Sequence, residues 1–467
     1  MKWLRSRWLK TIMLAILGIV VALVSYGLLQ LIEPVELAPI VKSAQLIEFA
    51  GRGLLVTSDA DMVATAYADA KLDRVTGIED TLTTISLPLN PDRPIVSPIR
   101  VSNSVMSWPQ IIAVSPDGKR AYIAEVRSPP ADGVREFANI EEMPAGKKIT
   151  VVNIANLEQP KILQTVTVGK NPKHLSISPD GKLLAINLEE PGQELAIFRI
   201  QPDGTLGERT NFAIAKDFSR STVLEAAVWH PSGNFLAITT TSDGSEGKFT
   251  SFVAFYKVVR SDRIIQIEPY DRPLEVGNHL SHARFTADGR FLLVPDLKWR
   301  QYSLRALNFL LNPKGEMVAI RFEPESNKPP EIASRTEVGL SPEGFALSPD
   351  NSLIATVNMR RTYFSPSVPP VWRGKSSSSL SLVKFAPKTG QLTTVGEYGF
   401  EGLLPEQATF DANGKSLAVV IFNYREQSPK TGAVEFWNVV SSNQPKLERT
   451  GFKLNVVRGA HDIVLVP

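Results

Sequence analysis

The sequence predicts an all-β fold, a seven-bladed β-propeller of four-stranded antiparallel blades, preceded by one apolar N-terminal helix. Three observations predict it. A strand–turn–strand phrase occurs six times, the two chain ends look like parts of one further unit, and 22 uncharged residues stand near the N-terminus. The 34 prolines and 30 glycines among 467 residues agree with a fold rich in turns. Two β-sandwich domains are the alternative, but they would not explain the regular phrase or the split unit.

The N-terminal segment has the pattern of a membrane element. Residues 1–10 carry four basic side chains and no acid, and residues 11–32 follow without a charge. A bilayer core needs about 20 apolar residues of helix, so we expect a single-pass transmembrane helix or signal anchor at 11–32. A cleaved signal peptide is the alternative, although Glu36 and Lys42 occupy positions where cleavage after Ala38 or Ala44 requires small residues.

This interpretation predicts a cytoplasmic segment at 1–10, a linker at 33–45 and a body at 46–467. The body is expected on the exported side of the cell membrane, periplasmic or extracellular. Residues 1–10 supply four positive charges of the formal net charge of +3, which leaves the rest at −1. A near-neutral body gives no electrostatic basis for nucleic-acid binding.

Several kinds of chemistry are excluded or unsupported. The chain has no cysteine, which excludes disulfides, thiolate metal sites and a cysteine nucleophile. Gly-Lys-Ser begins at Gly374 and at Gly414, but neither copy has the earlier glycine of a phosphate-binding loop. His279 and His282 lie three residues apart at the start of an expected strand, which is a weak metal pattern. We therefore expect no metal and no cofactor.

The recurring phrase is an apolar strand, a Ser-Pro-Asp-Gly-Lys turn and a second apolar strand, as in LSISPDGKLLAIN. Its turn begins at Ser115, Ser178, His230, Thr286, Ser348 and Asp411, at intervals of 52 to 63 residues. Proline presets φ for the turn, and Asp-Gly or Asn-Gly supplies positive φ, so each copy predicts a hairpin. Two more β-rich runs follow, such as 195–200 and the stretch around 211–215. One unit is therefore a four-stranded blade.

The two ends of the chain complete the count of blades. Residues 461–467, HDIVLVP, match the first strand of a unit and stop where its turn should follow. After Gly51, the runs GLLVTSD, MVATAYA and TLTTISL are expected to be the second, third and fourth strands of a unit that lacks its first. Six complete units and one shared unit give seven blades. Pairing of the last strand with the first would close the ring and leave no open sheet edge.

The repeats also carry a family resemblance. NPKHLSISPDGKLLAIN, GNHLSHARFTADGRFLLVPDL and GLSPEGFALSPDNSLIATVN resemble the YVTN and lactonase-like propellers of the 6-phosphogluconolactonase type. The resemblance covers about residues 45 to 467. It implies a seven-bladed propeller and, as an activity, the hydrolysis of a sugar lactone. A shared fold does not fix a function, so the resemblance specifies the fold more strongly than the activity.

The sequence departs from that family where chemistry would be expected. After Val-Pro-Asp-Leu the family typically continues Gly-x-Asp, and here Lys298 and Arg300 occupy the Gly and Asp places. The family's next blade usually opens with an Arg-His pair, which Glu343 and Gly344 replace here. An arginine there could stabilise an oxyanion and a histidine could act as a base. Lactone hydrolysis by this chain is therefore an open question.

Blade geometry predicts one polar rim. The first strand of a blade lies innermost and starts at one face of the channel, and the loop after the second strand returns to that face. Polar residues four or five positions before each turn should therefore share a rim with those that end the second strands. Our candidates for binding are His174, Glu225, His282, Glu343, Glu406, His461, Asn187 and Asn358. Solvated lining of a channel mouth is the alternative interpretation.

Three long loops should enlarge this rim, at 125–148, 296–305 and 358–379. The last two combine arginine with tyrosine and tryptophan, a composition that suits anions, sugars or a partner surface. We add Arg300, Arg360 and Arg361 to the binding candidates, among neighbours that include Trp299, Tyr302, Arg305, Tyr363, Trp372, Arg373 and Lys375.

Two functional hypotheses follow. The first is a membrane-anchored, exported binding module that holds an envelope protein or a small polar ligand at its rim. The second is a lactonase-like hydrolase, for which His174, His282 and Glu343 are the weak candidates for acid–base chemistry. The sequence does not decide whether the chain is an enzyme.

Overall fold

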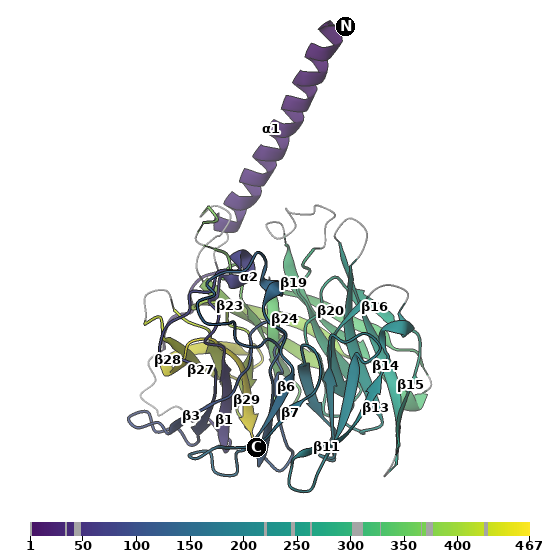
Figure 1. Ribbon diagram of the computed structural model, residues 1–467. Coiled ribbons are helices and arrows are strands. Elements are labelled where there is room, and N and C mark those ends of the chain that lie inside the picture. Colours follow the sequence, from purple (N-terminus) through teal and green to yellow (C-terminus); the bar gives the residue numbers. More distant parts are fainter. Residues whose placement is uncertain are drawn as a thin grey trace.

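The chain forms one β-propeller with a long N-terminal helix that projects from it (Figure 1). The computed structural model describes residues 2–32, 35–41, 48–218, 222–243, 248–261, 264–300, 312–326, 328–365, 367–369, 377–424 and 428–467. Helix α1 (Lys2–Ile32) precedes the sheets, and seven sheets make up the body. Over the part of the chain that is described, no helix meets the length and apolarity that a membrane crossing requires.

Each complete repeat forms one antiparallel sheet, with its strands in sequence order. The first three blades contain β4 (Ile112–Val114), β5 (Arg120–Ala124), β6 (Lys148–Asn153) and β7 (Lys161–Thr167); β8 (Lys173–Ile177), β9 (Leu183–Asn187), β10 (Leu195–Ile200) and β11 (Leu206–Phe212); and β12 (Thr222–Trp229), β13 (Phe235–Asp243), β14 (Phe249–Arg260) and β15 (Ile265–Pro269). A fifth strand, β16 (Leu274–Gly277), pairs with β14.

The next three blades have the same order. They contain β17 (Arg284–Phe285), β18 (Phe291–Asp296), β19 (Lys314–Arg321) and β20 (Glu331–Leu340); β21 (Pro342–Leu347), β22 (Leu353–Asn358), β23 (Ser377–Ala386) and β24 (Gln391–Glu401); and β25 (Ala408–Phe410), β26 (Ser416–Ile421), β27 (Thr431–Val440) and β28 (Lys446–Val457). Short 3₁₀ turns lie at Ile140–Glu142, Ala215–Asp217 and Pro324–Ser326.

The seventh blade joins the two ends of the chain, as the sequence predicts. Its strand order is β29 (Ala460–Val466), β1 (Gly53–Ser58), β2 (Thr81–Ser86) and β3 (Val96–Arg100). β29 pairs antiparallel with β1, with Gly53 opposite Val466. β29 also contacts both β4 and β25, the innermost strands of the neighbouring blades, so the ring is closed.

One strand assignment from the sequence is wrong. The run MVATAYA, expected as a strand, is not part of a sheet; it leads into the short helix α2 (Ala66–Asp69), and β2 is the third strand of the blade. Met62, Ala64 and Ala66 are buried in an apolar cluster with Leu297 and Phe364, side chains of two other connections. The alternation of apolar residues thus reflects packing beneath the rim, and alanine favours helix over strand.

The hairpin turns explain why the phrase repeats. In the first copy, Ser115 Oγ donates to Asp117 Oδ1 at 2.6 Å, and the backbone N–H of Arg120 donates to Ser115 Oγ at 2.9 Å. Gly118 has φ +67°, a conformation that costs other residues energy. The Ser178 turn repeats both side-chain bonds. Each copy therefore fixes the register of one inner strand pair, and with it the residues that begin the strand at the opposite face.

Candidate functional site

A β-bulge interrupts the start of the innermost strand and determines the direction of the candidate side chains. Between β8 and β9 the register shifts between Lys173 and Leu175, which leaves His174 as the extra residue. The same shift leaves Glu225 extra in β12, Glu343 in β21 and His461 in β29. A bulge bends the strand and redirects a side chain, and bulges are frequent beside functional sites.

The two remaining inner-strand candidates lie in equivalent places. Pairing shifts by one residue between the bridge Leu280–Asp296 and the pair Arg284–Leu293, a stretch that holds His282. It shifts likewise between Leu403–Asn423 and Ala408–Val419, a stretch that holds Glu406. All six candidates from the inner strands therefore lie at or beside a register shift near the start of the strand, although their distance from the following turn differs by one residue.

The three histidines are buried and uncharged. His174, His282 and His461 are each 1% exposed or less. Burial lowers the pKa of His174 and of His461 to about 3, and it lowers that of His282 well below its ordinary value. His461 Nε2 lies 2.8 Å from Asn103 Oδ1, whereas no ring nitrogen of His174 or His282 has a hydrogen-bond partner among the described residues.

Burial raises the pKa of two glutamates in the channel. Burial raises the pKa of Glu343 to about 8. Burial, and next the charge of Glu343, raise the pKa of Glu406 well above its ordinary value. Glu406 Oε2 lies 3.9 Å from His461 Nδ1. The buried groups of the channel therefore include neutral imidazoles and two carboxyl groups whose pKa values are raised.

A cavity of about 160 Å³ opens at the channel mouth. The cavity is lined by inner strands, by loops after second strands and by the connection between β3 and β4. Its lining residues are Tyr67, Met106, Ser107, Trp108, Lys173, Glu225, Trp299, Glu343, Met359 and Tyr363. The Trp108 and Trp299 ring centroids are 6.3 Å apart at 61°, and those of Trp299 and Tyr363 are 5.7 Å apart at 45°. The walls are thus mainly aromatic and sulfur-containing.

Charged groups form part of the same lining. Lys173 Nζ lies 3.1 Å from Glu189 Oε1 and 3.7 Å from Glu225 Oε2. Burial opposes the charge of Lys173, but Glu225 and Glu189 outweigh it and raise the pKa of Lys173. Glu225 also accepts a hydrogen bond from Trp108 Nε1 at 2.8 Å. Glu343 is 2% exposed, and its Oε2 has no hydrogen-bond partner among the described residues.

Comparison with known proteins identifies the fold. No protein-family model matches the chain, and no curated protein matches it by sequence. Among solved structures, the periplasmic gluconolactonase of Pseudomonas aeruginosa is 16% identical with a TM-score of 0.56, over 89% of this chain and 99% of that one. A putative 6-phosphogluconolactonase from Bacteroides fragilis is 15% identical with a TM-score of 0.56, over 89% and 98%.

The chain has the fold of the lactonase-type seven-bladed propellers. A putative 6-phosphogluconolactonase from Bacteroides uniformis gives a similar result, with 16% identity and a TM-score of 0.53. At such identities the likeness establishes the lactonase-type fold and leaves activity to the residues of the site.

Spacing within the repeat separates only some cavity residues from deeper ones, because Glu406, also five positions before its turn residue Asp411, does not line the cavity. Lys173, Glu225 and Glu343 stand five positions before their turn residues, and all three line the cavity. His174 and His282 stand four positions before theirs and do not line it. One residue of strand is about 3.3 Å, so the histidines lie one step deeper in the channel. The repeated phrase alone does not distinguish the two positions.

The other predicted binding residues lie outside the cavity lining. Asn358 is buried and donates to Ser379 Oγ and Ser381 Oγ, which gives it a structural role in the fifth blade. Asn187 is also buried at the end of β9. Glu406 lies in the channel, beside His461.

The three arginine candidates contact side chains of the protein outside the cavity lining. Arg300 is exposed and lies over the Phe249 ring at 4.4 Å. Arg360 pairs with Glu397 at 3.3 Å, and Arg361 lies over the Tyr26 ring of α1 at 5.9 Å. Tyr302, Arg305, Trp372, Arg373 and Lys375 fall outside the described residues.

Some cavity residues have no sequence signal. Tyr67 belongs to α2, and Met106 and Trp108 belong to the connection between β3 and β4, outside the repeated phrase. Trp299 and Tyr363 do lie in the long loops predicted to enlarge the rim. The remaining long loop, 125–148, contributes instead to a separate cavity of about 700 Å³ with the segment at 72–80.

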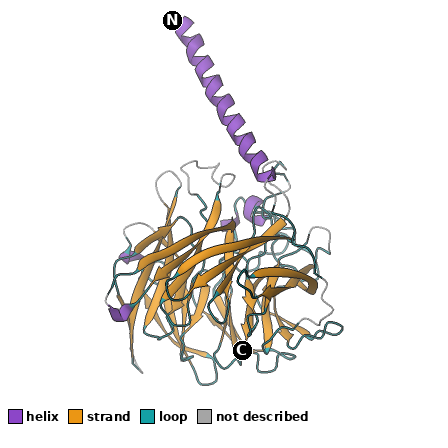
Figure 2. Ribbon diagram, turned by 180° about the vertical axis from the view of Figure 1, so that it is seen from behind, coloured by secondary structure: helices purple, strands orange, loops and turns teal. Residues whose placement is uncertain are grey.

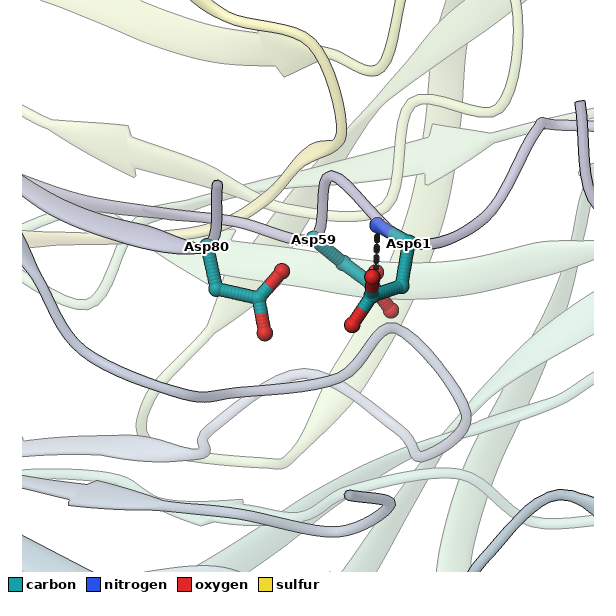
Figure 3. A group of neighbouring side chains, drawn as sticks. All are labelled: Asp59, Asp61 and Asp80. Atoms are coloured by element: carbon teal, nitrogen blue, oxygen red, sulfur yellow. Dashed lines mark hydrogen bonds between the residues drawn. The ribbon is translucent and has the colours of Figure 1, made fainter. Parts of the chain in front are cut away.

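Three aspartates gather beside that larger cavity, a group that the sequence analysis did not single out. Ligand atoms of Asp59, Asp61 and Asp80 lie within 4.8 Å of one another (Figure 3). Asp59 accepts the backbone N–H groups of Asp61 and Val105, both at 2.9 Å. Arg74 pairs with Asp61 at 3.0 Å. These contacts hold two connections together and already balance part of the charge, so we assign the group no ligand.

Proposed function

We propose that this chain is a ligand-binding β-propeller that holds a small molecule at its channel mouth. The cavity carries this proposal, because its aromatic walls enclose the buried groups Lys173, Glu225 and Glu343. Binding pockets typically combine apolar walls with a few placed polar groups. A buried carboxyl oxygen without a hydrogen-bond partner is costly, and a ligand that supplies one would offset that cost.

Tryptophan fluorescence offers a direct test, because Trp108 and Trp299 line the cavity. A panel of small sugars, lactones, amines and carboxylates is titrated against the full chain. We expect saturable quenching that Trp299→Phe reduces. Trp8→Phe, at an exposed position of α1, is the matched control and should leave the titration unchanged. Quenching that Trp299→Phe leaves intact would contradict a site in this cavity.

A lactonase-like hydrolase is the second candidate. The fold likeness to a periplasmic gluconolactonase supports it, and Glu343 could donate a proton from the cavity wall. The histidines give it less support, because His174, His282 and His461 do not line the cavity. An assay of gluconolactone hydrolysis separates the two candidates. The reaction is monitored in weakly buffered solution through the acid that it releases. A rate above the spontaneous one that Glu343→Gln abolishes would establish the hydrolase.

The binding module is further proposed to be exported and held at the membrane by α1. Residues 12–24 of α1 include exposed apolar side chains such as Leu14, Leu17 and Val20, and basic residues precede them. The expected result is that the full chain stays in the membrane fraction after alkaline carbonate extraction. Release of the intact chain into the supernatant would overturn the anchor. An envelope protein bound at the rim stays a prediction from the sequence.

A further inference from the structure

The walls of the cavity have the arrangement of an aromatic box. Tyr67, Trp108, Trp299 and Tyr363 come from four separate connections. Trp299 meets Trp108 and Tyr363 at oblique angles rather than in a parallel stack. Trp108 Nε1 donates to Glu225, and Trp299 Nε1 donates to Ser341 Oγ at 3.0 Å. These bonds fix the ring edges through groups of the protein itself. Oblique aromatic rings around a small space attract cations through their π faces.

The charge balance of the cavity also favours a cation. Lys173, its only described cationic lining residue, is matched by Glu189 and Glu225. Glu343 has no such counter-ion, and burial is the cause of its perturbed pKa. An anionic ligand would meet the carboxyl groups of Glu225 and Glu343 with a lysine that is already paired. A cationic ligand would supply the missing partner of Glu343.

The size of the cavity restricts the ligand to a small group. Its volume of about 160 Å³ is below the roughly 300–1,000 Å³ of pockets for drug-sized ligands. Met106 and Met359 complete the lining. Thioethers are polarizable and adapt to irregular apolar shapes, so they suit N-methyl or methylene groups. The cavity therefore fits a head group, with the remainder of the molecule outside the mouth.

We infer that the ligand carries an ammonium group, primary or methylated, which sits in the aromatic box with the Glu343 carboxylate as its counter-ion. This inference rests on the proposed binding function and names the chemical class of the ligand. If this inference is correct, neutral sugars and carboxylates are not the preferred ligands.

Proton release should accompany binding. The pKa of Glu343 is about 8 without a ligand, so at neutral pH the carboxyl group must lose its proton to pair with a cation. The groups that face it are Tyr67, Tyr363 and Glu406, with Lys173 and Glu225 also in the cavity lining. For a permanently charged ammonium, affinity should rise up to about tenfold per pH unit below pH 8 and level off above it.

The position of α1 allows two sources of the ammonium group. Tyr26 of α1 donates to the backbone carbonyl of Asn312 at 3.2 Å and contacts Arg361, two residues before Tyr363. Figures 1 and 2 show that α1 leaves the propeller beside α2, which contributes Tyr67 to the cavity. The mouth thus lies on the α1 side, where either a lipid head group or a soluble amine could reach it.

Calorimetric titration of the full chain, in maltoside detergent, tests the inference. The probes are tetramethylammonium, choline and ethylammonium, compared with glucose, gluconolactone and acetate, at pH 6 to 9. We expect the ammonium probes alone to bind, more tightly at pH 8 than at pH 6. Glu343→Gln and Trp299→Leu should each weaken binding about tenfold or more. Glu401→Gln, at an exposed position of β24, is the matched control.

Each result separates the two proposals. If a sugar, lactone or carboxylate binds in a Trp299-dependent manner and the ammonium probes do not, the ammonium inference is overturned and the binding function stands. If no probe of any class binds, both are overturned. Because Gln keeps the size of an uncharged Glu, Glu343→Gln should fold; Trp299→Leu provides an independent check. Dihexanoyl phosphocholine binding at least tenfold tighter than choline would indicate a lipid source, and equal affinity a soluble amine.

Discussion

Replacing Glu343 by glutamine should stabilise the protein, and the gain should grow with pH. In the folded chain the pKa of Glu343 is raised from 4.5 to about 8 by burial, so the folded state binds a proton that the unfolded state has lost. The contribution of Glu343 to folding stability is therefore fully present below pH 4.5, is lost as pH rises from 4.5 to about 8, and stays constant above that range. At about 1.4 kcal/mol per pH unit, the wild type loses at most about 5 kcal/mol over this interval.

Glutamine removes this cost because it has no proton to lose. Thermal unfolding followed by circular dichroism, at pH 5, 6, 7 and 8, compares the wild type with Glu343→Gln. The two melting temperatures should nearly coincide at pH 5 and differ by several degrees at pH 8, with the variant higher. Glu401→Gln, at an exposed carboxylate, should show no such divergence. A difference between wild type and Glu343→Gln that stays constant from pH 5 to pH 8 would refute the reasoning.

Three further predictions concern the closed ring and its sheets. Ile463→Ala, a fully buried position of the closing strand, should cost about 2–5 kcal/mol in urea unfolding, whereas Val464→Ala beside it should cost less; equal costs would contradict the packing of β29. Arg449→Ala should cost about 3–5 kcal/mol, because it leaves Glu435 buried without the bond from Arg449 Nε at 2.6 Å, and Arg449→Met with Glu435→Leu should restore most of the loss. Gly289→Ala should lower the melting temperature more than Gly414→Ala: both glycines have positive φ, but a Cβ on Gly289 would lie 2.2 Å from His230 Nε2, and similar losses would argue against that contact.

The repeated parts of the fold could be predicted because each repeat contains the same kind of turn residues between two apolar strands. A serine that bonds an aspartate two residues later, with glycine at positive φ, allows little besides a tight hairpin. The closing strand followed from the same pattern, since HDIVLVP lacks only its turn. The strand predicted at 62–68 was wrong because this run belongs to no repeat. Its apolar residues pack beneath the rim instead of in a sheet.

The candidate site was predictable only in part, because its depth depends on contacts between blades. Blade geometry places Glu225 and His174 on one rim, yet a single strand position separates the cavity wall from the channel interior. The aromatic side chains that close the cavity come from loops of unequal length, which no repeat constrains. Trp108 is an example: it reaches Glu225, 117 residues away, from a connection without a motif.

The low pKa values of the channel histidines count against these side chains as general bases. A general base works best when its pKa lies near the operating pH, and burial holds the pKa of His174 and His461 at about 3. These imidazoles are neutral, weak bases one layer beneath the cavity, and no described lining residue is a histidine. Glu343 differs, because it reaches the cavity and can exchange a proton for a cation. Lys173 and Glu225 of the lining are already paired with each other, so Glu343 is the lining carboxyl group left to meet the charge of the proposed ligand.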